Sequence, residues 1–195
     1  MFLNSLLLLI LIHGHYCFVV KDIEDHFLPE NEFKRKISDT PTHALREIFP
    51  KTSLELFKKA YFIESIKFSG STYLLSKDSL FFYPSFGQAM CGLVGGYLVE
   101  VNTIQELEFI KHFLFEKASR FGIVMAGGTD EDHEGLWINR YSQTKVDSLW
   151  NAGQPDDFKG GQNCQVFYKP YNWNLDDNSC VFNSREVGFL CEVKD

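Results

Sequence analysis

Residues 150–164 read WNAGQPDDFKGGQNC, and this stretch decides how the rest of the chain is interpreted. Between its first glutamine and its final cysteine, five side chains carry a carboxylate or an amide: Gln154, Asp156, Asp157, Gln162 and Asn163. So many side-chain oxygens either solubilise a surface turn or face one hard cation, because Ca²⁺ takes about six to eight oxygen ligands in a flexible geometry. The remainder of the chain is needed to choose between these two interpretations.

The composition is that of a globular, acidic chain. It has 195 residues, of which 45% are hydrophobic and 15% aromatic. This length fits one ordinary domain plus an extension, and the apolar fraction is sufficient for a buried core. The formal net charge of -7 argues against nucleic acid or an anionic membrane surface as a partner. Cations and neutral ligands suit such a chain better.

The N-terminus predicts a secretory signal peptide. Its first residues, MFLNSLLLLILIHGHYC, contain an apolar run at 6–12 that is too short to span a bilayer. We expect cleavage between residues 14 and 18, and the alternative is an uncleaved anchor. No later segment has the length and hydropathy of a membrane span, so we expect a secreted, extracellular protein. The predicted divisions are a signal peptide at 1–17, an N-terminal extension with one or two helical turns at 18–60, and a folded domain at 61–195.

The cysteines predict two disulfides. Cys17 lies at the predicted signal boundary, and four other cysteines remain: Cys91, Cys164, Cys180 and Cys191. An even number of cysteines in an oxidising compartment indicates disulfide pairs. Four cysteines permit three pairings, and the residues alone leave all three open.

The first predicted helix lies in the middle of the chain. It is expected to begin at Pro84 and Ser85, and Ser85 and Gln88 have the spacing of a capping box. The pair Gly95-Gly96 is expected to end it, because glycine readily adopts the left-handed conformation at a helix C-terminus.

A second helix and several strands complete the predicted α+β fold. The helix is expected near Thr103, which has capping-box spacing to Glu106. Strands are expected where aromatic and β-branched residues gather: 66–76, 78–83, 97–101, 122–128, 136–140, 164–168 and 187–193. Two helices followed by a half rich in strands and loops indicate the α+β class.

The order of several segments resembles the C-type lectin-like domain over residues 62–195. The matching segments are AMCGLVGGYLVEVNTIQELEFI (89–110), GIVMAGGTDEDHEGLWIN (122–139), SLWNAGQPDD (148–157), DDNSC (176–180) and GFLCEV (188–193). The resemblance implies two helices with antiparallel sheets and a long calcium-binding loop region. It also implies the disulfides Cys91–Cys191 and Cys164–Cys180.

The resemblance further implies a Ca²⁺ site that binds sugar. Its ligands would be Gln154, Asp156, Gln162, Asp176 and Asp177, with a cis peptide bond before Pro155. In the family, two neighbouring sugar hydroxyls bind the ion and hydrogen-bond to the same side chains. The order Gln154-Pro155-Asp156 is that of galactose-type members. Phe158 stands where such members place a ring that stacks on the sugar, and the alternative is that its ring packs into the core.

Two positions depart from the usual ligand set. Gln162 replaces the family's glutamate and Asp176 its asparagine, so the set keeps three negative charges: Asp156, Asp176 and Asp177. The reversal of this second pair bears on the choice of sugar. The motif Trp173-Asn174 also comes two residues early, so Asn174 is an alternative ligand to Asp176. We favour Asp176, because the disulfide and the alternation of faces fix the register of a strand.

A second cation site and two other functions are alternatives. Asp130, Glu134, Asp157 and Asn163 match the family's auxiliary calcium positions, whereas the simpler interpretation is a solvated acidic turn. The family also contains members that bind a protein partner or a mineral surface without sugar. A single sugar site is usually weak, so a homo-oligomer would raise the avidity. Binding of microbial or self glycans is the role that the resemblance implies.

Signatures of catalysis are missing from the sequence. The histidines at 26, 43, 112 and 133 lack metal-ligand spacing with cysteine or glutamate. Neither a Gly-x-Ser-x-Gly motif nor a phosphate-binding loop is present. The sequence therefore predicts binding without catalysis.

Overall fold

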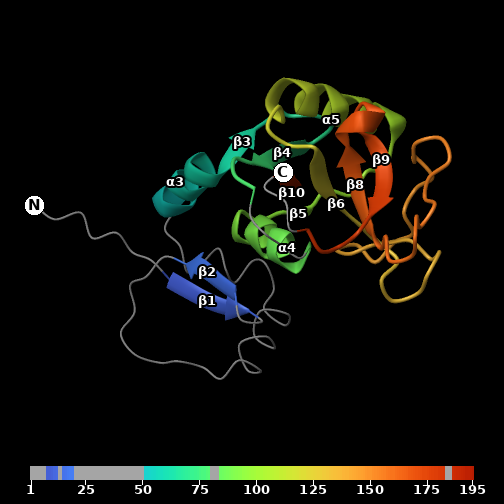
Figure 1. The fold of residues 1–195 in the computed structure, drawn as a ribbon. Coiled ribbons are helices and arrows are strands. Elements are labelled where there is room, and N and C mark those ends of the chain that lie inside the picture. Colours follow the sequence, from blue (N-terminus) through green and yellow to red (C-terminus); the bar gives the residue numbers. More distant parts are fainter. Residues whose placement is uncertain (1–7, 13–14, 20–50, 80–83, 183–185) are drawn as a thin grey trace, which may run out of the picture. The chain divides into compact units, whose positions relative to one another are not determined.

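The computed structural model describes residues 8–12, 15–19, 51–79, 84–182 and 186–195 (Figure 1). The chain divides into two units, 1–40 and 41–195. The first contains two antiparallel strands, β1 (Leu8–Ile12) and β2 (His15–Val19). The signal peptide at 1–17, the extension at 18–60 and the domain at 61–195 stay predictions.

Three helices are described in the second unit, where two were expected. They are α3 (Lys51–Tyr61), α4 (Pro84–Leu93) and α5 (Ile104–Lys117). The additional helix, α3, has 11 residues where one or two turns were expected. Leu54 and Phe57 pack against the core, and the Phe57 ring meets Phe62 at 6.2 Å between centroids. These apolar contacts extend the helix, because most helical stability in proteins comes from packing of one face.

Eight strands form one mixed sheet. They are β3 (Phe62–Glu64), β4 (Ser71–Ser76), β5 (Tyr97–Leu98), β6 (Ile123–Thr129), β7 (Ile138–Asn139), β8 (Cys164–Tyr168), β9 (Asn174–Asn178) and β10 (Val187–Lys194). The main order is β3-β4-β10-β6-β8-β9, with β5 on β10 and β7 on β6. A short 3₁₀ helix, Lys169–Tyr171, joins β8 to β9.

One pair of strands departs from the antiparallel sheets that the resemblance implies. The first half of β10 pairs with β6 in parallel, from Val187 opposite Ile123 to Phe189 opposite Met125. The second half of β10 pairs antiparallel with β4 and β5. No tight turn connects β6 to β10, so the local sequence does not fix their relative direction. The α+β class is nevertheless confirmed.

The central strands β4, β6 and β10 are buried on both faces, with α5 on one side and α4 on the other (Figure 1). Neighbouring residues of a strand point to opposite faces. Leu75 and Leu190 therefore contribute to the cluster beneath α5, whereas Leu74 and Phe189 contribute to the cluster with α4. This arrangement leaves the polar loops between β7 and β9 outside the core.

The sequence predicted the N-terminal cap of α5 correctly but not that of α4. Thr103 is the N-cap of α5 and accepts from the Glu106 N–H at 3.1 Å, as expected. The capping box at Ser85 was wrong. Ser85 lies inside α4, and the Gln88 side chain accepts from the Leu98 N–H at 3.0 Å instead.

The glycine pair ends α4 as predicted. Gly95 has φ 80°, and the N–H of Gly96 reaches back to the Cys91 carbonyl at 2.9 Å. This is the hydrogen-bond pattern of a Schellman motif. Of the strand expected at 97–101, only Tyr97–Leu98 forms; of that at 78–83, residues 80–83 lie outside the described residues.

Both disulfides that the resemblance implies are present. Cys91–Cys191 joins α4 to β10 in the core, and both cysteines are fully buried. Cys164–Cys180 joins the start of β8 to the segment after β9. The second bond therefore lies at the base of the polar loops and holds together the two strands that border them.

Candidate functional site

The loop before β8 is fastened to β9 by hydrogen bonds. The Asn151 N–H donates to the Leu175 carbonyl at 2.8 Å. The N–H groups of Asp156 and Asp157 donate to the two carboxylate oxygens of Asp177, at 3.0 and 2.7 Å. Asp177 is only 1% exposed, so its carboxylate is a buried anchor for the loop. Charge-assisted bonds of this kind are stronger than neutral ones.

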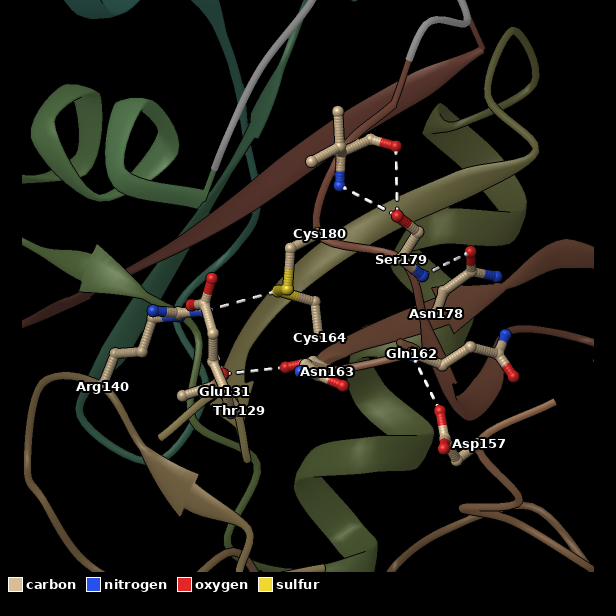
Figure 2. Close-up of a disulfide and its surroundings, with 11 residues drawn as sticks. Thr129, Glu131, Arg140, Asp157, Gln162, Asn163, Cys164, Asn178, Ser179 and Cys180 are labelled. Carbon is tan, nitrogen blue, oxygen red and sulfur yellow. Dashed lines mark hydrogen bonds and ion pairs between the residues drawn. A yellow bond between two sulfur atoms is a disulfide. The ribbon is translucent and has the colours of Figure 1, made fainter. Parts of the chain in front are cut away.

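The loop closes back on the same strand near its end. The Gln162 N–H donates to Asp157 Oδ1 at 2.9 Å, a bond drawn in Figure 2. Its side-chain Nε2 donates to the Asp177 carbonyl at 3.1 Å. The peptide bond between Gln154 and Pro155 is cis, as the resemblance implies. The structure thus brings the predicted loop residues and β9 together.

Three of the predicted ligands carry a buried oxygen without a hydrogen-bond partner. These atoms are Gln154 Oε1, Gln162 Oε1 and Asp176 Oδ1. Nearly all buried polar atoms in proteins are hydrogen-bonded, and leaving one unpaired costs about 1–3 kcal/mol. A cation would satisfy all three unpaired acceptor oxygens. The donor chemistry therefore fits Ca²⁺, which prefers carboxylate and amide oxygens.

Negative charge is concentrated at the same place. Burial, and then the nearby charges of Asp177 and Asp156, together raise the pKa of Asp176 to about 6. Like charges held together in a site of low polarity disfavour the ionised form. A divalent cation would remove this penalty by attracting all three carboxylates.

The alternative ligand Asn174 is engaged elsewhere. Its Nδ2 donates to Asn151 Oδ1 at 3.2 Å, near the start of the loop. Asp176, by contrast, lies within electrostatic reach of Asp156 and next to the anchor Asp177. The geometry of the described residues thus agrees better with Asp176 than with Asn174.

Phe158 is exposed and not packed in the core. Its side chain is 63% exposed, and the Lys159 ammonium lies 5.0 Å from the ring centroid. The Phe158 N–H donates to Asp156 Oδ1 at 3.3 Å, which keeps the ring next to the predicted ligands. An exposed aromatic ring at this position could stack on the apolar face of a sugar.

The second predicted set also contains unpaired oxygens. Asp130 is 2% exposed, and its Oδ1 has no hydrogen-bond partner, whereas its Oδ2 accepts from the Gly135 N–H at 2.8 Å. Asn163 Oδ1 is likewise buried and unpaired. Desolvation, and then the charges of Asp130 and Asp157, raise the pKa of the exposed Glu134 carboxyl. Asp130, Asp157 and Glu134 therefore lie near one another, although Glu134 remains on the surface.

Neither set is a preformed carboxylate cluster. Among the described residues, no three histidine, cysteine, aspartate or glutamate side chains are grouped as metal ligands. Both sets instead combine carboxylates with amides, so their fit to calcium depends on the unpaired oxygens.

No helix within the described ranges is long and apolar enough to cross a membrane.

Two residues beside the site were missed by sequence reasoning. Arg140 and Thr129 hydrogen-bond to each other at 2.9 Å, and Thr129 also donates to the carbonyl of Asn163 at 2.8 Å. Arg140 ends the strand expected at 136–140, and Thr129 directly follows the strand expected at 122–128. No local pattern distinguishes a strand-end arginine that contacts a distant loop from one that faces solvent.

Comparisons with known proteins agree with this fold. A family model described as "Lectin C-type domain" matches residues 85–193, which is more than half of the chain. The chain is 27% identical over 132 residues to human "C-type lectin domain family 4 member E", covering 65% of this chain and 55% of that protein. It is 27% identical over 129 residues to mouse "C-type lectin domain family 4 member G", covering 66% and 41%. The chain spans about half the length of these curated relatives.

Solved structures show the same fold. The human scavenger receptor C-type lectin carbohydrate-recognition domain has 25% identity and a TM-score of 0.55, covering 69% of this chain and 97% of that one. The carbohydrate-recognition domain of cow CD23, solved in the presence of a GlcNAc2Man3 oligosaccharide, has 21% identity and a TM-score of 0.55, covering 69% and 94%. Human lithostathine has 20% identity and a TM-score of 0.57, covering 68% and 97%.

Proposed function

The chain belongs to the C-type lectin domain family, and on that premise we propose that it is a secreted, Ca²⁺-dependent carbohydrate-binding protein that favours galactose-type sugars. The observation that supports this most directly is the set of unpaired, buried oxygens on Gln154, Gln162 and Asp176. They lie on a loop and a strand that hydrogen bonds to Asp177 hold together.

The proposed ligands are Gln154, Asp156, Gln162, Asp176 and Asp177. A bound Ca²⁺ would supply the positive charge to which two neighbouring sugar hydroxyls attach. The carboxylates would accept a hydrogen bond from each hydroxyl, and the amide groups of the glutamines would donate to it. Asp177 has a further role, because its carboxylate fixes the backbone of the loop at Asp156 and Asp157.

Galactose-type preference rests on the order of donor and acceptor. Gln154 and Asp156 flank Pro155 in the order that the resemblance associates with galactose. The exposed ring of Phe158 supports the same choice, because a galactose ring has an apolar face that stacks on aromatic side chains. The reversed pair, Gln162 and Asp176, is the feature that would favour a different orientation of the sugar.

A second calcium ion is also proposed, at Asp130, Glu134, Asp157 and Asn163. The buried position of Asp130 and the unpaired oxygens of Asp130 and Asn163 support it. Glu134 is exposed, and Asn163 stands where the family usually has an aspartate. This ion would tie the acidic turn to the loop and leave sugar binding to the first site.

Affinity chromatography tests the proposed function. The mature chain, refolded with its disulfides, is applied to galactose-agarose and to mannose-agarose in Ca²⁺ and is then washed with EDTA. We expect retention on galactose and release by EDTA. Retention on mannose alone would show that the reversed pair sets the sugar orientation. No retention on either resin, together with no Ca²⁺ binding, would favour a protein partner or a mineral surface.

Secretion and assembly have separate tests. Expression of the full chain in cells that secrete proteins should release it into the medium, with its new N-terminus between residues 14 and 18. A chain that stays in the membrane fraction would indicate an uncleaved anchor. Light scattering of the secreted protein measures its mass and so tests the proposed homo-oligomer, which would raise avidity for glycans with several copies of the sugar.

A further inference from the structure

Arg140 lies directly after β7, with its guanidinium against the Cys164–Cys180 disulfide (Figure 2). Its Nη2 donates to Thr129 Oγ1 and to Glu131 Oε2, both at 2.9 Å, and lies 3.4 Å from Cys164 Sγ. The Arg140 side chain is only 24% exposed, so its bond to Thr129 is partly buried, whereas the Glu131 side chain is 54% exposed. One cation therefore joins the end of β6, the acidic turn and the start of β8.

A short relay leads from this cation to the backbone of the candidate site. The Thr129 hydroxyl, which accepts from Arg140, donates to the Asn163 carbonyl at 2.8 Å. The same hydroxyl oxygen accepts from the Glu131 N–H at 3.2 Å. Asn163 directly follows Gln162, whose N–H and side chain are bonded to Asp157 and β9. The relay therefore fixes one end of the loop from the side opposite to β9.

We propose that Arg140 is a positioning residue for calcium. It holds two segments that carry proposed ligands, 130–134 and 162–163, in register with each other. Arg140 hydrogen-bonds to none of the proposed ligand side chains, so its effect passes through Thr129 and Glu131. This inference rests on the proposed function. Groups in such an outer layer typically change metal affinity by about 10- to 100-fold.

The direction of the effect separates positioning from electrostatics. Removing a positive charge beside a site rich in carboxylates should strengthen Ca²⁺ binding if long-range charge dominates. Loss of positioning should weaken binding instead, because the ligands must then be ordered when the ion arrives. A neutral substitution at Arg140 therefore gives opposite results under the two explanations.

The test compares Arg140→Gln and Thr129→Val, singly and together, with a matched control. Arg120→Gln removes the same charge from a surface arginine that pairs with Asp78 on another part of the domain. Ca²⁺ dissociation constants are measured by calorimetry, and stability in EDTA by urea unfolding. We expect each site variant to bind Ca²⁺ about tenfold more weakly than the wild-type protein. The double variant should also bind about tenfold more weakly, and not about a hundredfold, because both substitutions break the same relay. Thr129→Ser, which keeps the hydroxyl, should restore wild-type affinity.

The inference would be overturned if Arg140→Gln bound Ca²⁺ at least as tightly as Arg120→Gln, or if the two site substitutions were additive. If the wild-type protein bound no Ca²⁺, the proposed function would fail, and amide hydrogen exchange in EDTA would test positioning by itself. Arg140→Gln should then speed exchange of residues 157–164 by about tenfold, with α5 unchanged and no such effect in Arg120→Gln. Equal exchange in the two variants would contradict the positioning role.

Discussion

Asp177 on β9 accepts the backbone N–H of Asp157 at 2.7 Å, although 20 residues separate them in the chain. The other oxygen of the same carboxylate accepts the preceding N–H, that of Asp156. A buried aspartate therefore fixes the loop that carries the proposed calcium ligands. This relationship makes loop geometry and cation binding depend on the same side chain.

Asp177→Asn should reduce both properties. The substitution leaves one acceptor oxygen for two loop N–H groups and removes one of the three negative charges. Hydrogen bonds to charged groups contribute about 1.5–3 kcal/mol each, so we expect unfolding in EDTA to become easier by about 2 kcal/mol or more. Ca²⁺ affinity should fall by about a hundredfold, the upper end of the range for groups that orient metal ligands.

Urea unfolding in EDTA and calorimetric titration with Ca²⁺ measure the two effects. Asp147→Asn is the control, because this substitution removes the same charge from an exposed aspartate. Wild-type stability and affinity in Asp177→Asn would show that Asp177 neither anchors the loop nor contacts the ion.

Asp176 predicts how stability depends on pH in the absence of calcium. Its pKa of about 6 exceeds the ordinary value of 3.8, so the folded state binds this proton more tightly than the unfolded state does. The free energy of unfolding in EDTA should therefore rise as the pH falls, by about 1 kcal/mol between pH 7 and pH 5.5. Stabilisation by Ca²⁺ should shrink over the same interval, because protonated Asp176 is a poor ligand.

Thermal unfolding at several pH values, in EDTA and in Ca²⁺, measures both trends. Asp176→Asn should flatten the dependence in EDTA, because no group then titrates at that position. A wild-type protein whose stability in EDTA is as flat as that of Asp176→Asn, or falls between pH 7 and pH 5.5, would contradict the assignment.

Phe158→Ala should weaken sugar binding alone. The ring is exposed, so its removal should change stability by no more than about 0.5 kcal/mol. Loss of stacking should lower galactose affinity by about three- to tenfold, which corresponds to about 0.5–1.5 kcal/mol. Phe158→Trp, which keeps an aromatic face, is the matched control. Unchanged galactose binding in Phe158→Ala would place the ring outside the sugar site.

The two disulfides should contribute to different properties. Cys164→Ser with Cys180→Ser releases a loop of sequence separation 16, which costs about 3 kcal/mol in the chain-entropy estimate. Because this pair borders the loops, Ca²⁺ affinity should fall as well. Cys91→Ser with Cys191→Ser, of separation 100, should cost nearer 5 kcal/mol and loosen the whole core.

Chemical unfolding and calcium titration of both double variants test this division. We expect the first double variant to remain folded in EDTA with weaker Ca²⁺ binding. Wild-type Ca²⁺ affinity in that variant would mean that the bond does not support the site.

The sequence predicted those features that short-range chemistry controls. Thr103 and Glu106 marked the start of α5, and Gly95 marked the end of α4, because caps involve residues only a few positions apart. The loop from Gln154 to Cys164 was recognisable because its oxygens and its proline are close in sequence. The disulfide pairing came from the resemblance, since the cysteines alone permitted three arrangements.

Features that depend on distant contacts were not predictable in this way. The parallel pairing of β6 with β10 follows from tertiary packing and not from any turn. Gln88 caps no helix, because its side chain reaches Leu98 on the neighbouring strand. Likewise, the contact of Arg140 with Thr129 and Cys164 appears only when three separate segments come together.

Calcium binding itself is the most direct test of the account. The refolded mature chain, stripped with EDTA, is titrated with Ca²⁺ by calorimetry at pH 7.5, in the absence and in the presence of galactose. Saturable binding of at least one ion, weakened about a hundredfold in Asp177→Asn and tightened by galactose, is the predicted result. No saturable binding, in a protein whose disulfides and fold are intact, would contradict the claim that the unpaired oxygens of this loop form a cation site.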